Sequence, residues 1–392
     1  MTKKTFLIII ITHPIQYFSS VFRALVAKED LDILVIFACD HGLRKTFDVD
    51  FSQSLSWDNN LLGGYKSEFL STQAISDLAK PIQATKLALL ARNRIKELNP
   101  DAVLIYAYSP LFITISTLLL RLSNITLLLR ADGTDSALPR AIIKTYIRDI
   151  ILKLYYKNFI HIFPIGSDSY AHYQRLGVPK TKLSKVLFSV DVEFFKHQKI
   201  NLLLNKADLR AELGIPVDAN VIIYVGKMAE NKSPFLLVES LKYLPIDLKS
   251  NCWLLAVGDG PLRYQFESAA LEVLPNRCKF VGFANQSQLA KYYSLADLLV
   301  LPSRETWGLV VNEAIQFGLK VISSSCAGCS ADLVHGNPNG RVFEFPNAQS
   351  LSTCIKILLR QKYISVKLNL PKPESLANAV SKVMGTLNKS RA

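Results

Sequence analysis

The 392-residue sequence has few charged residues, no repeat, and no tract rich in glycine, serine or proline. Charged residues make up 20% of the chain and hydrophobic residues 49%, a balance that excludes a disordered chain or a solenoid. A globular chain of this length is too long for one ordinary domain. We therefore predict two domains, each with its own core, and a cleft between them.

Cysteine is scarce, with six residues scattered along the chain. This distribution argues against a disulfide framework and favours reduced thiols in the cytoplasm. Cys326 and Cys329 form a CxxC pair, but no second pair or nearby histidine completes a zinc site. We interpret the pair as structural or incidental.

Acidic residues are outnumbered, with 46 lysines and arginines against 32 aspartates and glutamates. This excess of positive charge suits nucleic acid, an anionic membrane surface or phosphorylated ligands. The sequence has no zinc-finger spacing, no aromatic RNA-binding signature and no block of consecutive basic residues. We therefore expect no nucleic-acid partner.

Two apolar stretches resemble membrane segments but are interrupted or short. The run "FLIIII" after Lys4 is too short for a signal-peptide core and predicts a buried first strand. The run from Val103 to Leu120 has 18 uncharged residues, but Pro110 divides it into a strand-like and a helix-like half. We expect neither to span a bilayer. The expected location is cytoplasmic, with a peripheral position on the inner face of the plasma membrane as a further option.

Short apolar runs alternate with stretches of helical periodicity in both halves of the chain. The runs are "FLIIII", "LDILVIFA", "AVLIYAY", "ITLLLR" and "FIHIFPIG", then "VIIYVG", "CWLLAVGDG", "CKFVGF", "DLLVLPS", "KVISS" and "GRVFEF". This alternation is typical of doubly wound parallel sheets. A polar, irregular region near residues 194–215 separates the halves. We predict an α/β chain with Rossmann-like domains at 1–196 and 197–375, and a C-terminal helix or tail at 376–392 that packs back toward the first domain.

Ligands of doubly wound sheets bind beyond the carboxyl ends of the strands. After "VIIYVG", Lys227 and Lys232 are suited to hold a diphosphate without a metal, with a solvated basic loop as the alternative. After "CWLLAV", Gly258 and Gly260 form a tight turn that lets backbone approach a ligand closely. Both strand ends are therefore candidates for a donor site.

The most specific pattern is "RETWGLVVNEAIQFG", which follows "DLLVLPS". Glu305 and Glu313 are eight residues apart, with Gly308 and Leu309 between them at a loop-to-helix transition. A helix amino terminus offers N–H groups and a positive dipole to a phosphate, while the carboxylates can accept hydrogen bonds from sugar and ribose hydroxyls. One helix start can thus bind three parts of a sugar nucleotide.

The order of these elements resembles the carboxyl-terminal domain of family 4 glycosyltransferases (group 1 glycosyl transferases). The resemblance runs from "VGK" through "GDGPL" and the two glutamates to a small-residue loop that ends at Asp332 and to Asn339-Gly340. In the first half, "HPIQY" and "WDNNLLGGY" are similar to a bacterial polysaccharide-type subset of this family. The resemblance implies a GT-B fold, in which two Rossmann-like domains face a cleft.

The family resemblance also implies roles for these residues. Lys227 and Lys232 would contact the donor diphosphate, Glu305 the donor sugar, and Glu313 the ribose. The other donor-side residues are Gly258, Gly260, Gly308 and Leu309. The first basic position is more often arginine in the family, and lysine lacks its bidentate phosphate contact.

The first half supplies the acceptor-side candidates. Many family members have a Gly-Gly pair after the first strand, whereas this sequence has His13 and Gln16 there. We take His13 as a catalytic candidate, with a structural role as the alternative. After "ITLLL", Arg130, Asp132 and Asp135 stand where many family members have a histidine. Asp132 can orient or deprotonate the acceptor hydroxyl, or merely cap a helix.

Two further features concern a metal. Asp48 and Asp50 in "FDVDF" match a metal-binding DxD motif, but that motif belongs to the other major transferase fold. We expect a solvated loop there. We also expect no metal or other cofactor, because lysines and helix dipoles can replace the cation.

The stretch 140–159 predicts a basic amphipathic helix. Arg140, Lys144 and Arg148 recur at four-residue spacing, and the apolar residues available for another face are Ile143, Ile147, Ile150, Ile151 and Leu154. Such a helix suits an anionic membrane surface and a lipid-linked acceptor. The alternative is an ordinary packed surface helix.

These patterns predict a retaining, hexosyltransferase-type enzyme. It would move a sugar from a UDP- or GDP-linked donor to a hydroxyl of a glycan or lipid-linked acceptor, in bacterial cell-surface polysaccharide or glycolipid synthesis. The alternatives are a non-hydrolysing sugar-nucleotide 2-epimerase of similar fold and a non-catalytic sugar-nucleotide-binding module. Release of nucleotide only in the presence of an acceptor would exclude the epimerase, and nucleotide binding without turnover over a panel of acceptors would support the binding module.

Overall fold

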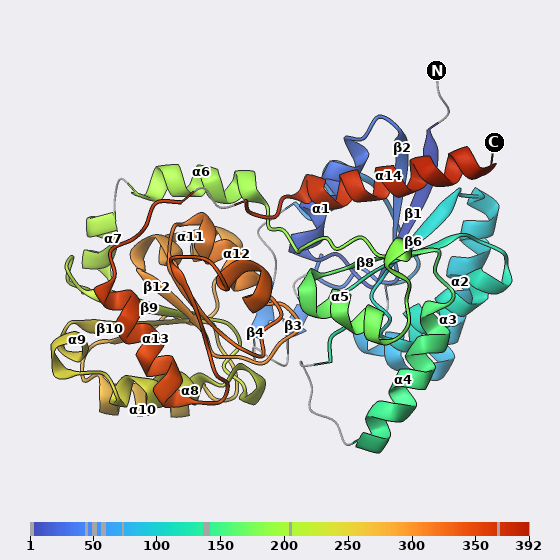
Figure 1. The fold of residues 1–392 in the computed structure, drawn as a ribbon. Coiled ribbons are helices and arrows are strands. Elements are labelled where there is room, and N and C mark those ends of the chain that lie inside the picture. Colours follow the sequence, from blue (N-terminus) through green and yellow to red (C-terminus); the bar gives the residue numbers. More distant parts are fainter. Residues whose placement is uncertain are drawn as a thin grey trace.

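The computed structural model describes residues 4–43, 46–48, 53–55, 60–72, 74–135, 142–203, 206–366 and 369–391. Two six-stranded sheets form the cores of two domains (Figure 1). The first sheet has the order β5-β2-β1-β6-β7-β8 and the second β11-β10-β9-β12-β13-β14, and all paired strands in both are parallel. The predicted pair of doubly wound α/β domains is confirmed.

The first domain contains the following elements: β1 (Thr5–Ile11), α1 (Gln16–Val26), β2 (Leu31–Phe37), β5 (Lys66–Phe69), η1 (Ile75–Ala79), α2 (Pro81–Leu98), β6 (Ala102–Tyr106), α3 (Leu111–Leu122), β7 (Leu127–Ala131), α4 (Ile142–Tyr156), β8 (His161–Pro164), α5 (Gly166–Arg175) and η2 (Lys180–Lys182). Strands β3 (Thr46–Asp48) and β4 (Gln53–Leu55) form a separate antiparallel pair. The central strands are hydrophobic along their length because helices cover both faces of a parallel sheet. Pro110 does separate a strand from a helix, β6 from α3.

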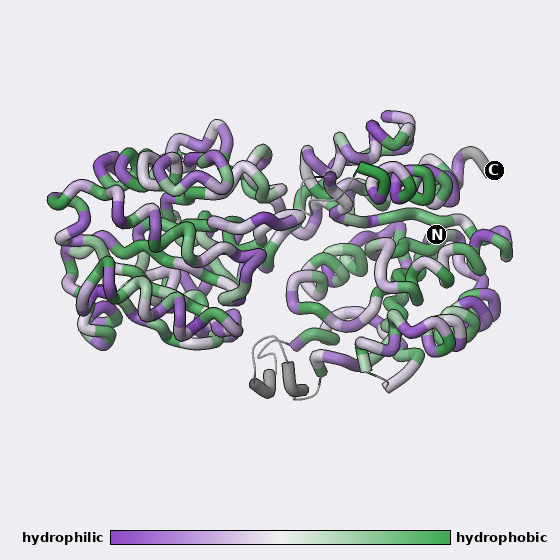
Figure 2. The backbone as a smooth tube through the Cα atoms, turned by 90° about the horizontal axis from the view of Figure 1, so that it is seen from below, coloured by the Kyte–Doolittle hydropathy of each residue, from purple (hydrophilic) through white to green (hydrophobic). Residues whose placement is uncertain are grey.

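The second domain follows the same plan. Its elements are α6 (Val192–Leu203), α7 (Lys206–Glu212), β9 (Asn220–Val225), η3 (Glu230–Lys232), α8 (Pro234–Lys242), α9 (Ile246–Ser250), β10 (Cys252–Val257), α10 (Arg263–Val273), β11 (Cys278–Phe280), α11 (Gln286–Leu295), β12 (Leu298–Leu301), α12 (Leu309–Gln316), β13 (Lys320–Ser324), the short η4 (Ser330–Val334), β14 (Gly340–Phe343) and α13 (Ala348–Arg360). Figure 2 shows the two lobes, with hydrophobic segments running through each.

The segment expected to be irregular is largely helical, so that interpretation was wrong. It forms α6 and α7, and Phe195 of α6 is fully buried against Phe317 with ring centroids 5.8 Å apart. Helix α6 also packs on α11 and α12. The sequence did not indicate this helix because its buried side is covered by α11, α12 and Phe317, which are distant in the sequence.

The chain crosses back to the first domain through α14 (Pro373–Arg391), which lies along α1 (Figure 1). Leu376, Ala377, Val380 and Met384 are buried in the same hydrophobic cluster as β1 and β2. Asn388 donates a 2.7 Å hydrogen bond to Thr5 at the start of β1. Helix α14, which follows the second domain in sequence, therefore packs on the first domain and connects the two. Across the described ranges, no helix has both the length and the hydrophobicity to cross a membrane.

Candidate functional site

The carboxyl ends of the two sheets face each other across the domain boundary. In each sheet the strand order reverses beside the first strand, β1 or β9, and this switch point is where open α/β sheets bind ligands. Asp132 follows β7 in the first domain, and its Oδ2 accepts a 2.7 Å hydrogen bond from the Thr306 hydroxyl, which follows β12 in the second. The predicted acceptor-side aspartate thus lies next to the predicted donor loop.

A second polar contact joins the domains beside the first. The Asp332 carboxylate accepts hydrogen bonds from the Ser167 backbone N–H (2.6 Å) and hydroxyl (2.7 Å), and it pairs with Lys185 Nζ at 3.0 Å. Asp332 is nearly buried, so these bonds compensate its desolvation. Gly166 has a φ of +82°, and a Cβ there would lie 2.4 Å from the Trp307 ring. The two domains are therefore closely fitted at this point.

Lys232, in the basic loop after β9, contacts Glu305, the first of the two predicted donor-site glutamates. Lys232 Nζ lies 3.0 Å from Glu305 Oε1, and the Ser303 hydroxyl donates to the same oxygen. Both side chains remain partly exposed, as a residue that binds ligand must be. Lys227 is also partly exposed and lies at the end of the neighbouring strand β9. The structure thus brings together Lys232 and Glu305, which are 73 positions apart (305 − 232).

The predicted glycines adopt backbone conformations that other residues resist. Gly258 has a φ of +129°, and a Cβ there would lie 2.0 Å from the Gly226 carbonyl oxygen. Gly260 has a φ of +151°, and a Cβ there would lie 2.6 Å from the Met228 carbonyl oxygen. Gly308 caps the amino end of α12 at a φ of +113°, directly before Leu309. These turns bring backbone to the edge of the site.

Glu313 differs from a simple exposed ribose ligand, because its side chain is fully buried. Burial raises its pKa to about 7, although the side chains of Tyr293, Tyr17 and Gln286 oppose this shift. The Tyr293 hydroxyl donates a 2.7 Å hydrogen bond to Oε2. Tyr17 belongs to α1 of the first domain, so Glu313 lies beneath an interdomain contact.

The residues after β1 are placed near the cleft but are partly enclosed. His13 Nδ1 lies 2.9 Å from the Thr12 hydroxyl, and its ring packs edge-on against His41. Burial and the nearby His41 lower the pKa of His13 to about 4, so the ring is neutral at pH 7. Gln16 is buried, and its Oε1 lacks a partner within the described residues. These contacts of His13 are therefore with Thr12 and His41, which follow β1 and β2 of the first domain.

Arg130 is buried and bonded to backbone carbonyls. Its guanidinium donates to Val186 O at 2.5 Å and Leu187 O at 3.2 Å, and it lies over the Phe188 ring at 5.5 Å. Burial lowers the pKa of Arg130 to about 10, so it stays charged at pH 7. These contacts fix the segment that leads to the second domain, in addition to any acceptor-side role.

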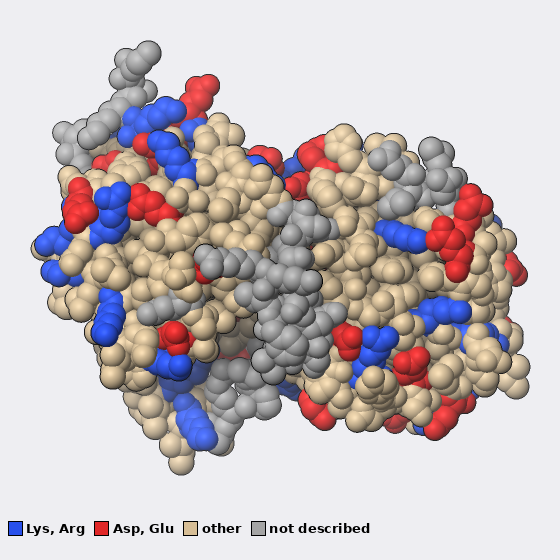
Figure 3. Space-filling view, turned by 180° about the vertical axis from the view of Figure 1, so that it is seen from behind, with Lys and Arg blue, Asp and Glu red and all other residues tan. Residues whose placement is uncertain are grey.

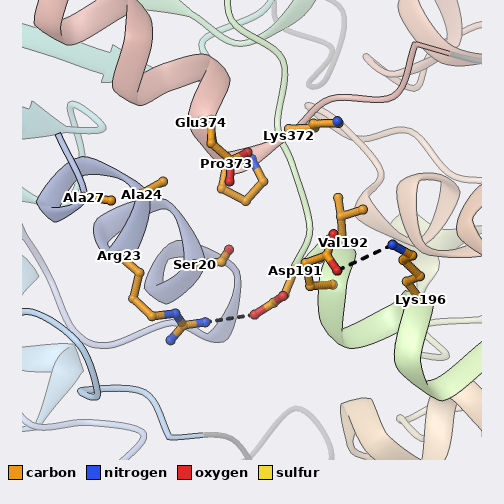
Figure 4. Close-up of a pocket in the computed structure, with 11 residues that line it drawn as sticks. Ser20, Arg23, Ala24, Ala27, Asp191, Val192, Lys196, Lys372, Pro373 and Glu374 are labelled. Atoms are coloured by element: carbon orange, nitrogen blue, oxygen red, sulfur yellow. Dashed lines mark hydrogen bonds and ion pairs between the residues drawn. The ribbon is translucent and has the colours of Figure 1, made fainter.

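Two cavities bear on where ligands bind. A cavity of about 190 Å³ opens at the carboxyl ends of β1, β6 and β7, and its lining includes Thr12, Tyr106, Arg130 and Asp132. A larger cavity of about 820 Å³ lies where both connections between the domains pass α1 (Figure 4). The Arg23–Asp191 ion pair, at 2.8 Å, borders it. None of the predicted site residues lines this larger cavity.

In the described part of the chain, no three histidine, cysteine or acidic side chains converge as metal ligands. Asp50 and the Asp48 side chain lie outside the described residues. All six cysteines are free, and Cys329 of the CxxC pair is buried beside Gly308. Metal independence stays a prediction.

Several residues that shape the site were not predicted from the sequence. Thr306 stands inside the "ETWG" motif, and Tyr17 stands inside "HPIQY", so each motif contained the signal. Ser167 and Lys185 carried no such signal, because only the fold brings them to Asp332, which is 165 residues from Ser167. The contacts between side chains of the two domains are therefore the main feature of the site that the structure shows and the sequence did not predict.

Comparisons with known proteins agree with this arrangement. Residues 205–382 match the family described as glycosyl transferases group 1. The chain is 29% identical over 165 residues to a lipopolysaccharide 1,2-N-acetylglucosaminetransferase of Salmonella typhimurium, covering 40% of this chain and 43% of the relative. It is 24% identical over 195 residues to a Campylobacter jejuni α-1,4-N-acetyl-D-galactosaminyltransferase named for a diNAcBac-PP-undecaprenol substrate, covering 48% and 54%.

Solved structures resemble the chain over nearly its whole length. Anabaena Alr3699/HepE in complex with UDP and glucose matches with a TM-score of 0.66 at 17% identity, covering 98% of this chain and 100% of that one. The sequence matches to the two curated relatives, in contrast, span about half of their length. The chain thus has the two-domain GT-B fold of glycosyltransferases, and its second half matches glycosyl transferases group 1.

Proposed function

We propose that this protein is a glycosyltransferase that moves a sugar from a nucleotide-diphosphate donor to an acceptor hydroxyl. The observation that carries the proposal is the meeting of two contacts at the facing sheet edges. Lys232 pairs with Glu305 on the donor side, and the adjacent Thr306 bonds to Asp132 on the acceptor side. A sugar held at Glu305 would therefore lie beside a carboxylate of the opposite domain.

The donor site follows from charge and backbone geometry. The partly exposed Lys232 can exchange its Glu305 partner for a diphosphate oxygen, and Lys227 extends the cationic surface along the end of β9. The amino end of α12, which follows Gly308, adds N–H donors and a positive dipole. Glu305, once released by Lys232, can accept hydrogen bonds from the sugar hydroxyls. Donor binding thus replaces contacts that already hold the site in shape.

For the chemistry, we propose transfer with retention, in which the acceptor attacks from the same face as the leaving diphosphate. The acceptor O–H bond and the bond from the anomeric carbon to the phosphate oxygen break, and a new glycosidic C–O bond forms. The departing phosphate accepts the acceptor proton. Asp132 orients the acceptor hydroxyl, because its Oδ2 already accepts a hydrogen bond from Thr306 and its second oxygen can accept another.

The proposed setting is bacterial cell-surface glycan synthesis with a UDP- or GDP-linked donor. The names of relatives support it: one acts in lipopolysaccharide synthesis, one is named for an undecaprenol-linked substrate, and one structure holds UDP and glucose. A glycan or lipid-linked acceptor fits these names. An epimerase of similar fold would need no acceptor, so acceptor dependence separates the two functions.

The proposal is tested by a screen of purified protein with UDP- and GDP-sugars, in which thermal stabilisation and nucleotide release are both measured. We expect one donor to stabilise the wild type and release nucleotide only with acceptor. Lys232→Ala should weaken donor binding about tenfold to a hundredfold, because one charge-assisted phosphate contact is lost. Lys242→Ala, an exposed lysine in the same domain, is the matched control.

Glu305→Gln separates binding from chemistry. The amide keeps the size of the side chain but cannot bind Lys232 as an ion pair, so donor binding should survive while turnover falls. Addition of EDTA should leave turnover unchanged if the lysines replace a cation. Stabilisation by no donor, or nucleotide release without acceptor, would refute the transferase proposal.

A further inference from the structure

Helix α4 exposes most of its large hydrophobic side chains on the surface of the protein. Seven large apolar side chains in this helix are between 45% and 88% exposed: Ile142, Ile143, Tyr146, Ile147, Ile150, Ile151 and Leu154. The spacing of positions 143, 147, 150 and 154 by four, three and four residues places them in one stripe along the helix. A surface helix normally buries such a stripe, so α4 presents an apolar surface without a partner in the described chain.

The opposite face of α4 is anchored by polar and aromatic contacts. Arg148 lies 3.4 Å from Asp135 and 3.5 Å from Asp149, and Asp149 also pairs with Arg175. Leu152, Tyr155 and Tyr156 complete the buried base. Because charged residues occupy the inner face, rotation of the helix to bury the stripe would break these ion pairs. The outward direction of the stripe is therefore fixed by the fold.

Cations flank the stripe. Lys144, Lys153 and Lys157 are exposed, and the single acidic residue of α4, Asp149, is bound on the inner face. Lys153, Lys157 and Lys182 line a cavity of about 340 Å³ together with Arg175. No ion pair engages these lysines in the described part of the chain. Figure 3 shows blue side chains next to uncharged ones at the projecting lower-left end of the first domain, where α4 lies.

We propose that α4 docks this protein on an anionic phospholipid bilayer, with the isoleucine stripe at the acyl-chain boundary and the lysines on headgroup phosphates. An apolar stripe bordered by cations matches the layered chemistry of such a surface. A second copy of the chain fits less well, because symmetric pairing would bring the lysines of both helices together without acidic partners. The inference does not depend on the proposed transfer reaction.

Docking through α4 would also place the acceptor side toward the membrane. Asp132 precedes the start of α4 by ten residues (142 − 132), and Arg148 of α4 bonds to the Thr134 carbonyl and to Asp135 in the same loop. These contacts hold Asp132 close to the docking helix, where a lipid-linked acceptor, as proposed above, would reach it from the membrane surface.

The test is flotation of the full-length protein with vesicles. One set is phosphatidylcholine alone, and the other contains about one third phosphatidylglycerol, enough to give the negative surface potential that attracts basic segments. We expect binding to the anionic set, with weaker binding in high salt. Ile143→Glu and Leu154→Glu should each weaken binding about tenfold or more, because each places a charge in the apolar layer. Ile246→Glu, an 85% exposed isoleucine in the other domain, is the control.

Charge reversal tests the lysines separately. Lys153→Glu and Lys157→Glu should each weaken binding about fivefold, while Lys242→Glu should not. Failure of the wild type to bind anionic vesicles, or equal binding by the α4 variants and Ile246→Glu, would overturn the proposal. So would a wild-type dimer that Ile143→Glu dissociates without any vesicle binding. Donor-induced thermal stabilisation is measured in parallel, so that loss of docking is distinguished from loss of donor binding.

Discussion

Asp132 and Thr306 are joined by a 2.7 Å hydrogen bond, although 174 residues separate them in the sequence. Asp132 directly follows β7 in the first domain, and Thr306 stands between Glu305 and Trp307 in the second. Trp307 is buried and donates through its indole N–H to Asn312, which in turn donates to the Phe188 carbonyl of the connecting segment. The donor loop is therefore held by the first domain through Asp132 and by the connecting segment through Phe188.

We expect the Asp132–Thr306 hydrogen bond to contribute to turnover. Thr306→Val and Asp132→Asn should each lower kcat/KM, and a double-mutant cycle should give a coupling of about 1–3 kcal/mol, typical of a partly buried bond to a charged group. Steady-state nucleotide release in the presence of acceptor measures it. Thr353→Val is the control, because the Thr353 hydroxyl donates to the Gln349 carbonyl of its own helix. Fully additive effects would show that the contact is incidental.

The buried Glu313 predicts a pH-dependent stability. Its pKa in the folded protein, about 7, lies above the ordinary value of 4.5, so folding favours the protonated form. The stabilisation is complete below about pH 4.5 and is lost as the pH rises through 7. Relative to Glu313→Gln, the wild type should lose about 3 kcal/mol between those limits.

Thermal unfolding at pH 5 and pH 8 measures this effect. The Tm of wild type minus the Tm of Glu313→Gln should fall by about 5 °C or more between the two values, given the usual relation between free energy and Tm for a domain of this size. Glu239→Gln, on the exposed side of α8, should show no such trend. A constant difference across the pH range would mean that Glu313 is ionised throughout.

Arg130 either contacts the acceptor or stabilises the fold, and a substitution distinguishes these two roles. Its bonds to the Val186 and Leu187 carbonyls predict that Arg130→Lys destabilises the protein by about 2–4 kcal/mol, because lysine cannot reach several carbonyls at once. Urea denaturation measures the change, with the exposed Arg121→Lys as the control. An unchanged midpoint together with a raised KM for acceptor would instead assign Arg130 to the acceptor.

The strands were predictable from sequence because both faces of each sheet are covered, which makes runs such as residues 6–11 continuously apolar. β5 was missed because it is a polar edge strand of four residues, "KSEF". Helix α6 was missed because its buried Phe195 is enclosed by residues of the second domain. Local patterns therefore predicted the layers, while elements defined by partners distant in sequence were not predicted.

The candidate site shows the same division. The spacing of Glu305 and Glu313 predicted a loop-to-helix donor site, and α12 does begin between them. Nothing in that spacing indicated that Glu313 would be buried, because burial arises from Tyr293 of α11 and Tyr17 of the other domain. Likewise, the apolar residues of α4 were visible in the sequence, but only the structure shows that they face outward.

Alanine substitutions at Gly258 and Gly385 test whether two backbone segments approach closely beside the donor site. Gly258 has a φ of +129°, and an added Cβ would lie 2.0 Å from the Gly226 carbonyl oxygen, whereas an added Cβ at Gly385, within α14, would meet no atom within 4 Å apart from its chain neighbours and its own helix backbone. Gly258→Ala should destabilise the protein by more than about 2 kcal/mol, since the strand ends must separate. Gly385→Ala should stabilise it by about 0.5–1 kcal/mol, the usual gain from replacing glycine in a helix. Chemical denaturation of both variants measures the two shifts, and shifts of the same sign would contradict the described turn between β10 and α10.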